Sequence, residues 1–387
     1  MPNTFPRRPA VIGGTALALI AVIGCGSGAG APTESGDGET RVAVTVTESG
    51  CQPTSLEASA GRIVFEVTNG GPELGEFEIL SGTRVVDEVE NIVPEFVVNL
   101  ATNLDGGQYE LICYALHAPR GALAVSGGVA ARPSSAVVDA ATLATYQDAY
   151  ETYVRGQAAE LVAGLAPFVA AIEAGDLEAA KAAYAPSRPS WERIEPVAEL
   201  FSDLDTRMDA REEDFAEGVD DPEFLGWHRL EKGLWKDGTT AGLAPIAAGL
   251  AADAADLQTR LATLDIEPRV IARGAGELIE EVAQSKLTGE EDRYSQADLW
   301  SVSANVAGSR QIVDILRPTL ESLDAAYLTE IDGAFDAVDE VIDRYADGDG
   351  YEPFSAVTAD DLKTLQARMA KLSEVLSELP GRLGLAA

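Results

Sequence analysis

The residues best suited to bind a metal ion lie around the second of the chain's two histidines. His228 and Glu231 are three residues apart, and on a helix this spacing puts both side chains on one face. An imidazole and a carboxylate at this offset can ligate one metal ion. The pair is a weak motif by itself, because a lone histidine beside a glutamate is more often an ordinary surface pair.

Two further acidic pairs precede His228 at helical spacing. Glu192 and Glu195 are three residues apart, and Asp205 and Asp209 are four apart. Carboxylates from several helices around one imidazole would form an oxygen-rich site, which suits iron, with zinc also admissible. Residues 192–231 hold fourteen acidic residues in all, so most of them must be solvated helix faces.

The other chemically capable residues are cysteines. His117 follows Cys113 by four residues, a spacing at which a cysteine and a histidine bind copper in cupredoxins. A blue-copper site also needs a second histidine and usually a methionine. The region has no second histidine and no methionine. Cys51 and Cys113 can form a disulfide that closes a loop of about 60 residues and stabilises the fold by roughly 4 kcal/mol. They can also be thiolate ligands together with Glu76, and both interpretations stay open.

The charge of the chain restricts its partners. Its 387 residues include 64 acidic and 28 basic ones, a formal net charge of -36, which argues against nucleic acid and anionic membrane surfaces. Cations are the binding partners that such a negative charge favours. With 46% hydrophobic residues, the chain can bury the cores of two to three domains.

The N-terminus has the features of an export signal. Two arginines precede the apolar run 10–23, and a glycine and Cys25 follow it. This run is too short for a membrane-spanning helix, so we expect residues 1–24 to be a signal peptide. The segment around Cys25 resembles a bacterial lipoprotein lipobox, in which that cysteine is lipidated. Residues 25–39 would then be a flexible tether to the extracytoplasmic face of the cell membrane.

The next region has the pattern of β-strands. Between residues 40 and 129, apolar and polar residues alternate in short segments, for example at Val42, Val44 and Val46. Turn-forming residues bound each segment. About seven such segments predict a β-sandwich.

The remainder of the chain has a helical pattern. Residues 130–137 interrupt the strand pattern and are expected to form a linker. From residue 138 to residue 387 the composition is rich in Ala, Leu, Glu and Asp, with apolar residues three or four apart, as at Leu161, Leu165 and Phe168. This period predicts helices. The expected fold class is therefore multidomain, a β-sandwich followed by an all-α domain.

Both regions resemble parts of a known family, the EfeO-type proteins. The helical region resembles their imelysin-like domain through residues 191–199, 203–205, 226–231, 289–295 and 298–300. The strand region resembles the cupredoxin-like domain that precedes it in the longer members, through residues 51–53, 75–78, 109–113 and 119–121. Together these segments cover nearly all of the chain after the predicted signal.

The resemblance implies an iron-uptake component that works with a membrane iron permease and a haem-containing peroxidase. It also implies helices packed antiparallel in two four-helix groups. The ion is expected to be Fe³⁺ or Fe²⁺, with zinc or copper as alternatives. The implied second site consists of Cys51, Glu76 and Cys113. The implied main metal site, in which Glu290 could replace its neighbour Glu291, consists of His228, Glu231, Glu192, Glu195, Asp209 and Glu291.

Two other functions remain in view. The imelysin-like domain is classed with metallopeptidases, so a zinc peptidase is the alternative to iron uptake. Such a site needs an open coordination position and a general base beyond the ligands, and the chain has no His-Glu-x-x-His motif. Polysaccharide binding occurs in short relatives, but the negative charge makes an acidic polymer a poor ligand unless metal ions bridge it.

Overall fold

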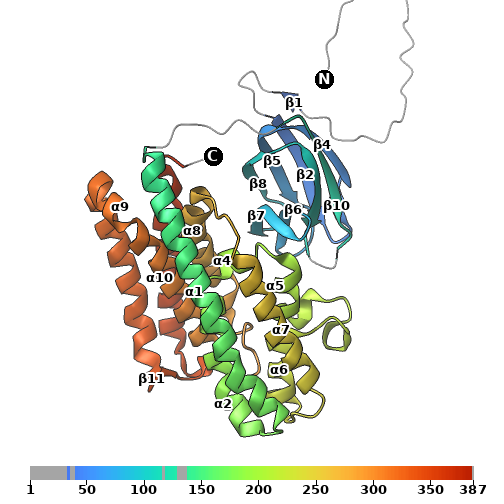
Figure 1. Cartoon of the computed structure of the whole chain (residues 1–387), viewed down its shortest axis with the longest axis vertical. Coiled ribbons are helices and arrows are strands. Elements are labelled where there is room, and N and C mark those ends of the chain that lie inside the picture. Colours follow the sequence, from blue (N-terminus) through green and yellow to red (C-terminus); the bar gives the residue numbers. More distant parts are fainter. Residues whose placement is uncertain (1–32, 35–39, 116–117, 129–136, 386–387) are drawn as a thin grey trace, which may run out of the picture.

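The structure is a computed structural model that describes residues 33–34, 40–115, 118–128 and 137–385. A β-sandwich comes first and an all-helical region follows (Figure 1), as the sequence predicts. The predicted signal peptide, Cys25, His117 and most of the predicted tether and linker lie outside the described residues.

Two sheets form the sandwich. One has the strand order β1-β2-β5-β8, with β3 paired to β2, and consists of Thr33–Glu34, Thr40–Thr47, Gly61–Asn69, Val97–Leu104 and, as β3, Gly50–Gln52. The other has the order β4-β10-β9-β6-β7, which is Ser55–Ser59, Gly121–Ser126, Gly107–Cys113, Gly75–Ser81 and Arg84–Ile92. The described strands outnumber the seven expected, because pieces as short as β1 and β3 have too few residues to show alternation.

Alternating side chains of the two sheets fill the space between them. Val42, Val44 and Val46 on β2 are buried as predicted, and the rings of Phe65 and Phe77 meet with centroids 5.4 Å apart. Burial of this kind contributes about 1.5–3 kcal/mol for each large side chain. The sandwich therefore has its own apolar core.

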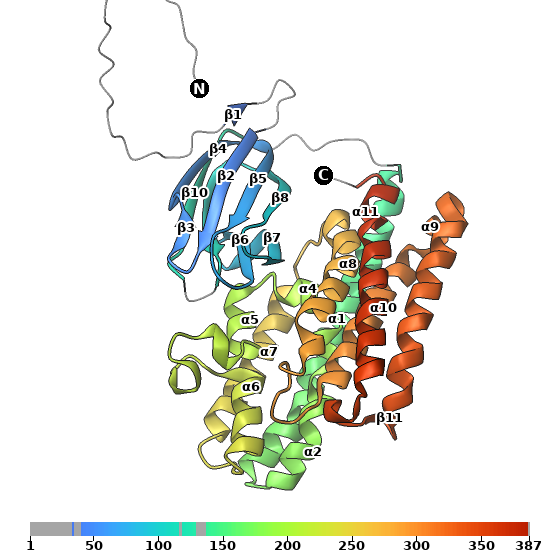
Figure 2. The same ribbon diagram turned by 180° about the vertical axis from the view of Figure 1, so that it is seen from behind.

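The helical region is built on five long helices. These are α1 (Ala140–Glu173), α7 (Ala244–Leu261), α8 (Pro268–Gln284), α9 (Asp298–Ile342) and α10 (Ala359–Ser377). Helix α9 is interrupted at Asp324, where the backbone is not helical, so it consists of two helical segments. Helix α1 packs against α7 and α2 (Leu177–Ser187), and it also contacts α8 and α9, which pack with α10. It extends along most of the region (Figures 1 and 2). Among the described residues, no helix has the length and apolar character needed to cross a membrane.

Short helices fill the space between the long ones. They are α3 (Pro189–Glu192), α4 (Glu195–Ala198), α5 (Ser202–Met208) and α6 (Gly226–Glu231), and α11 (Leu379–Arg382) follows α10. A π-helical turn at Lys232–Lys236 continues α6. Prolines at the starts of α3 and α4 separate each of them from the helix before it, because a proline in a helix interior removes a backbone hydrogen bond. Five of the six residues expected to bind metal in the helical region lie on or directly after these short helices.

The sandwich docks on the helical region through the outer face of its second sheet. Strands β6 and β7 face α4 and α5 (Figures 1 and 2). Leu80, Val85 and Ile112 from this face belong to the apolar core of the helical region. The backbone N–H of Val85 donates to the carbonyl oxygen of Leu200 at 2.8 Å. The two regions therefore share a continuous interface.

Candidate metal centre

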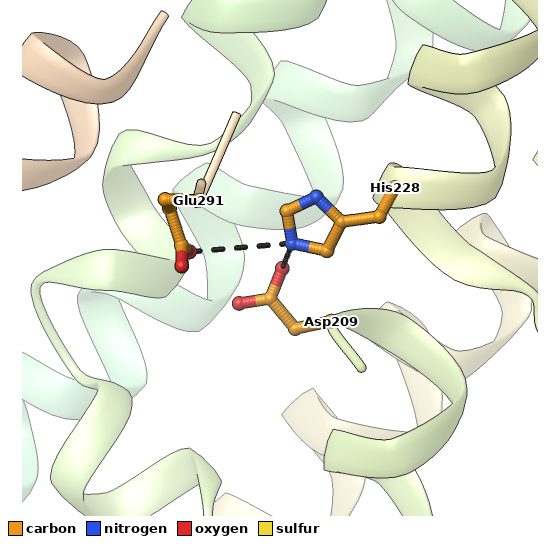
Figure 3. A group of neighbouring side chains, drawn as sticks. All are labelled: Asp209, His228 and Glu291. Carbon is orange, nitrogen blue, oxygen red and sulfur yellow. Dashed lines mark ion pairs between the residues drawn. The ribbon is translucent and has the colours of Figure 1, made fainter. Parts of the chain in front are cut away.

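The imidazole of His228 lies among four carboxylates. Its Nε2 atom is 3.3 Å from Oδ1 of Asp209 and 4.0 Å from Oε1 of Glu291 (Figure 3), and its Nδ1 atom is 3.8 Å from Oε2 of Glu231. Ligand atoms of Asp209, His228 and Glu291 all lie within 4.8 Å of one another. A second group within that limit consists of His228, Glu231 and Asp292. The ring thus belongs to two groups of possible ligand atoms, each with two carboxylates.

Close contact between α5 and α6 positions this group. Asp209 directly follows α5, and His228 lies in the first turn of α6. Gly226 begins α6 with φ of +69°, and a Cβ atom there would lie 2.1 Å from the carbonyl oxygen of Met208. Only glycine allows this approach. Glu291 arrives from the turn between α8 and α9.

Several polar atoms of the centre have no hydrogen-bond partner. His228 is 4% exposed, and neither of its ring nitrogens makes a hydrogen bond of acceptable geometry. Oε2 of the fully buried Glu231 is also without a partner. Each unpaired buried group of this kind costs about 1–3 kcal/mol. A cation between them would satisfy these atoms, and one imidazole with several carboxylates suits iron or another hard to borderline ion.

The charges around the ring determine its protonation. Burial lowers the pKa of His228, but Asp209 and Glu231 outweigh that effect and raise it to about 10. Burial raises the pKa of Glu291, but the nearby Lys286 ammonium outweighs it, and the pKa is lowered to about 2. The ring is therefore charged at neutral pH in the absence of an ion. A metal must displace its proton in order to bind a ring nitrogen.

Hydrogen bonds from outside the centre orient Asp209. Its Oδ1 atom accepts from Nη1 of Arg188 at 2.6 Å, and its Oδ2 atom accepts from the indole N–H of Trp191 at 2.7 Å. Trp191 packs against Trp227 with ring centroids 5.6 Å apart. Such outer contacts fix the direction in which a ligand presents its oxygen.

The second group of possible ligand atoms at His228 includes Asp292, a residue that sequence reasoning missed. Oε1 of Glu231 accepts the backbone N–H groups of residues 294 and 295 at 3.0 and 2.7 Å. Asp292 accepts the hydroxyl of Tyr184 at 2.7 Å. Asp292 adjoins Glu291 in an acidic run, and this adjacency is the signal that could have indicated it.

Glu192 and Glu195 are not brought to the ring. Lys286, 1% exposed, lies between them, with Nζ 3.1 Å from Oε2 of Glu192 and in contact with Oε1 of Glu195. Nη2 of Arg188 pairs with Oε1 of Glu192, and Asn305 donates to Oε2 of Glu195 at 2.6 Å. The two carboxylates act here as counterions of buried cations, and neither belongs to the two groups of ligand atoms at His228.

The implied second site is arranged differently. Cys51 and Cys113 form a disulfide with Cα atoms 5.1 Å apart, and both lie in the core of the sandwich. Phe77, the neighbour of Glu76, points into that core, so the Glu76 side chain points the other way, toward the helical region. Its Oε1 atom is buried without a partner. Among the described residues, Glu76 and the two cysteines do not form one group of ligand atoms.

Comparison with known proteins identifies both domains. The imelysin family model matches residues 146–379, and the cupredoxin-like domain model matches residues 15–125. The chain thus combines a cupredoxin-like domain with an imelysin domain, in that order.

Two curated relatives cover nearly the whole chain. The iron uptake system component EfeO of Escherichia coli (strain K12) is 44% identical over 343 residues, which are 88% of this chain and 91% of that protein. The EfeO protein of Shigella flexneri matches to the same extent. An apo copper binding protein solved by NMR covers 24% of this chain and 94% of its own, at 20% identity and a TM-score of 0.19, too low to carry an argument. The chain belongs to the EfeO family.

Proposed function

We propose that this protein is the iron-binding component of an iron-uptake system and captures iron at His228. Asp209, Glu291 and Glu231 would be the carboxylate ligands, with Asp292 beside them. The observation that supports this most directly is the buried imidazole with no hydrogen-bond partner at either nitrogen, among carboxylates from three parts of the chain. The EfeO relatives, whose name describes an iron uptake system component, favour iron as the ion.

The proposal extends to the place where the protein works. After removal of residues 1–24, a lipid on Cys25 and a tether over residues 25–39 would hold it at the extracytoplasmic face of the membrane. The domains are proposed as a cupredoxin-like sandwich at 40–129, a linker at 130–137 and an imelysin-like domain at 138–387. Captured iron would pass to a membrane permease, with a haem-containing peroxidase in the same system.

Titration of the purified protein tests the metal site. We expect saturable binding of Fe³⁺ supplied as citrate or of Fe²⁺ under anaerobic conditions, measured by calorimetry and elemental analysis. His228→Ala should weaken binding at least tenfold with unchanged helix content. Glu223→Ala, an exposed position shortly before α6, is the control and should bind as the unaltered protein does. Equal affinity in all three proteins would refute the site.

A zinc peptidase is the second candidate, because the imelysin model carries a peptidase name. The space directly against His228 and Glu231 is about 10 Å³, so a peptide bond and an attacking water would have to approach from the side of Asp209 and Glu291. Zinc-loaded protein incubated with an unfolded protein substrate provides the test. Cleavage that is lost in His228→Ala would favour the peptidase over iron uptake.

A further inference from the structure

A cleft between the two domains leads to the metal centre. Its volume is about 510 Å³, and both domains line it. Glu76, Glu90 and Tyr114 contribute from the sandwich, and among the lining residues from the helical region are Asp209 and Glu291. The cleft therefore extends from the cupredoxin-like domain to two of the carboxylates that we propose as metal ligands alongside His228.

The walls of this cleft are strongly acidic. Glu90 from the sandwich faces Glu199, Asp205 and Glu281 from the helical region across it. Oxygen atoms of Glu195, Glu199 and Glu281 lie within 4.8 Å of one another. Burial, together with the helical carboxylates Glu281 and Glu277, raises the pKa of Glu90 to about 8 when no cation lies between them, and a cation that enters the cleft would take the place of its proton. Carboxylates on both walls of a low-dielectric cleft concentrate cations.

Lys286 lies where the cleft meets the centre. Its Nζ atom is 3.4 Å from Oε1 of Glu281, which lines the cleft, and 3.8 Å from Oε1 of Glu291 at the centre. This ammonium repels an incoming cation, although its ion pairs with Glu192 and Glu195 offset part of its charge. A cation that moves from the cleft to the centre therefore passes beside Lys286.

On the side of the ring away from the cleft, the space that the described residues enclose is small. His228 is 4% exposed, and the space beside it away from the cleft is about 10 Å³. A buried metal site needs a path by which the ion can enter. Of the spaces around the centre in the described part of the chain, the interdomain cleft has the volume and the charge for that path.

We propose that the interdomain cleft is the route by which iron enters and leaves the His228 centre. The cupredoxin-like domain supplies one wall of it, so its role in metal binding is to form the entrance together with the imelysin domain. The carboxylates of Glu90, Glu199 and Glu281 attract the ion, and Lys286 separates them from the centre. This inference rests on the proposed function, because it assumes that His228 binds iron.

Association kinetics test the acidic walls. Fe²⁺ is mixed anaerobically with the full-length protein, and a chromogenic ferrous chelator reports the free ion at successive times. The double variant E90Q/E199Q should reduce the association rate constant at least fivefold at low ionic strength, with an unchanged dissociation rate constant. The control E57Q/E173Q removes two exposed carboxylates outside the cleft and should leave both constants unchanged. Equal association rates in both double variants would overturn the proposal.

A steric variant tests the route itself. Ala115 lines the cleft on the sandwich side, and Ala115→Trp should slow association and dissociation by the same factor, with an unchanged equilibrium constant. If this variant does not fold, as judged by circular dichroism, Ser285→Trp places the same obstacle on the helical wall. Unaltered rates in a folded variant would refute the route.

The outcomes separate this inference from the proposed function. If the unaltered protein binds no iron, both fail. A different result would be that the unaltered protein binds iron, that His228→Ala does not, and that the cleft variants have normal rates. In that case the metal centre is supported and only the route is wrong.

Discussion

At the scale of single residues, the carboxylates around His228 differ in the hydrogen bonds that they already accept. Asp209 is bonded to Arg188 and Trp191, whereas Oε2 of Glu231 has no partner. An arriving ion therefore gains most from Glu231, because Oε2 gives up no hydrogen bond to accept the new contact. Glu192 and Glu195, which pair with buried cations and do not belong to the two groups of ligand atoms at His228, contribute to stability instead.

Glu192 and Glu231 provide the test of that distinction. Glu192→Gln should destabilise the fold by about 3 kcal/mol, because it leaves the buried Lys286 and Arg188 with less compensating charge. Iron affinity of the folded variant should change little. Glu231→Gln should have the opposite result, a small loss of stability and at least a tenfold loss of affinity. Denaturant unfolding and calorimetric titration measure the two quantities, and a large affinity loss in Glu192→Gln would make Glu192 a ligand after all.

The pH dependence of metal binding also belongs to the residue scale. Because the pKa of His228 is raised to about 10, an ion that binds its ring must release a proton at neutral pH. Affinity should therefore rise about tenfold for each pH unit between pH 6 and 8. Titration with Co²⁺, which stays soluble over this range, measures the slope. His228→Ala should lose the slope, and a slope equal to that of the unaltered protein would show that another group releases the proton.

Sequence reasoning identified part of this centre. The spacing of His228 and Glu231 indicated a shared helix face, and Asp209 and Glu291 followed from family resemblance. The same resemblance placed Glu192 and Glu195 at the metal. It could not show that Lys286, some 90 residues away along the chain, is buried between them, because long-range pairing has no local signal.

At the scale of elements, the centre depends on how α5 and α6 meet. Gly226 allows the start of α6 to lie against the carbonyl of Met208, and this contact sets the separation of Asp209 and His228. The long helices were predictable from their apolar period. The short helices α3 to α6 were not, since four to seven residues span too few turns to show a period.

Gly226→Ala tests the contact. The added methyl group would overlap the backbone of Met208, so α6 must move away, and we expect at least a tenfold loss of iron affinity. Gly238→Ala is the matched control, because Gly238 also has a positive φ, +66°, but open space around its Cβ position. In both variants an alanine must adopt a positive φ, which lowers the free energy of unfolding by about 1 kcal/mol. Similar affinities in the two would show that the α5–α6 contact does not set the metal geometry.

At the scale of the whole molecule, opposing forces act between the domains. Carboxylates on both walls of the cleft repel one another. Apolar contacts and the buried ion pairs of Asp87 with Arg269 and Arg273 hold the domains together. Asp87, 1% exposed, lies 3.1 Å from Nη2 of Arg269 and also contacts Arg273. Burial raises the pKa of Asp87, but these two guanidinium groups outweigh it and lower the pKa. The contribution of Asp87 is therefore complete at pH values above the ordinary 3.8 and is lost as the pH falls through the lowered value.

Asp87→Ala should loosen the docking of the domains. It leaves Arg269 and Arg273 without their buried partner, at a cost of about 3 kcal/mol. Hydrogen exchange at the amide of Val85, which bonds across the interface, should accelerate at least tenfold. Glu48→Ala, an exposed change on the sandwich, is the control. Exchange as slow as in the unaltered protein would show that apolar packing alone holds the domains.

The contact of Trp191 with Asp209 has a practical consequence. The indole N–H bonds to a carboxylate at the metal centre, and the ring packs on a second indole, while the whole chain has four tryptophans. Half of the protein's tryptophans thus lie beside the centre. Occupation by a paramagnetic ion should quench their emission, so the unlabelled protein is its own optical indicator of loading.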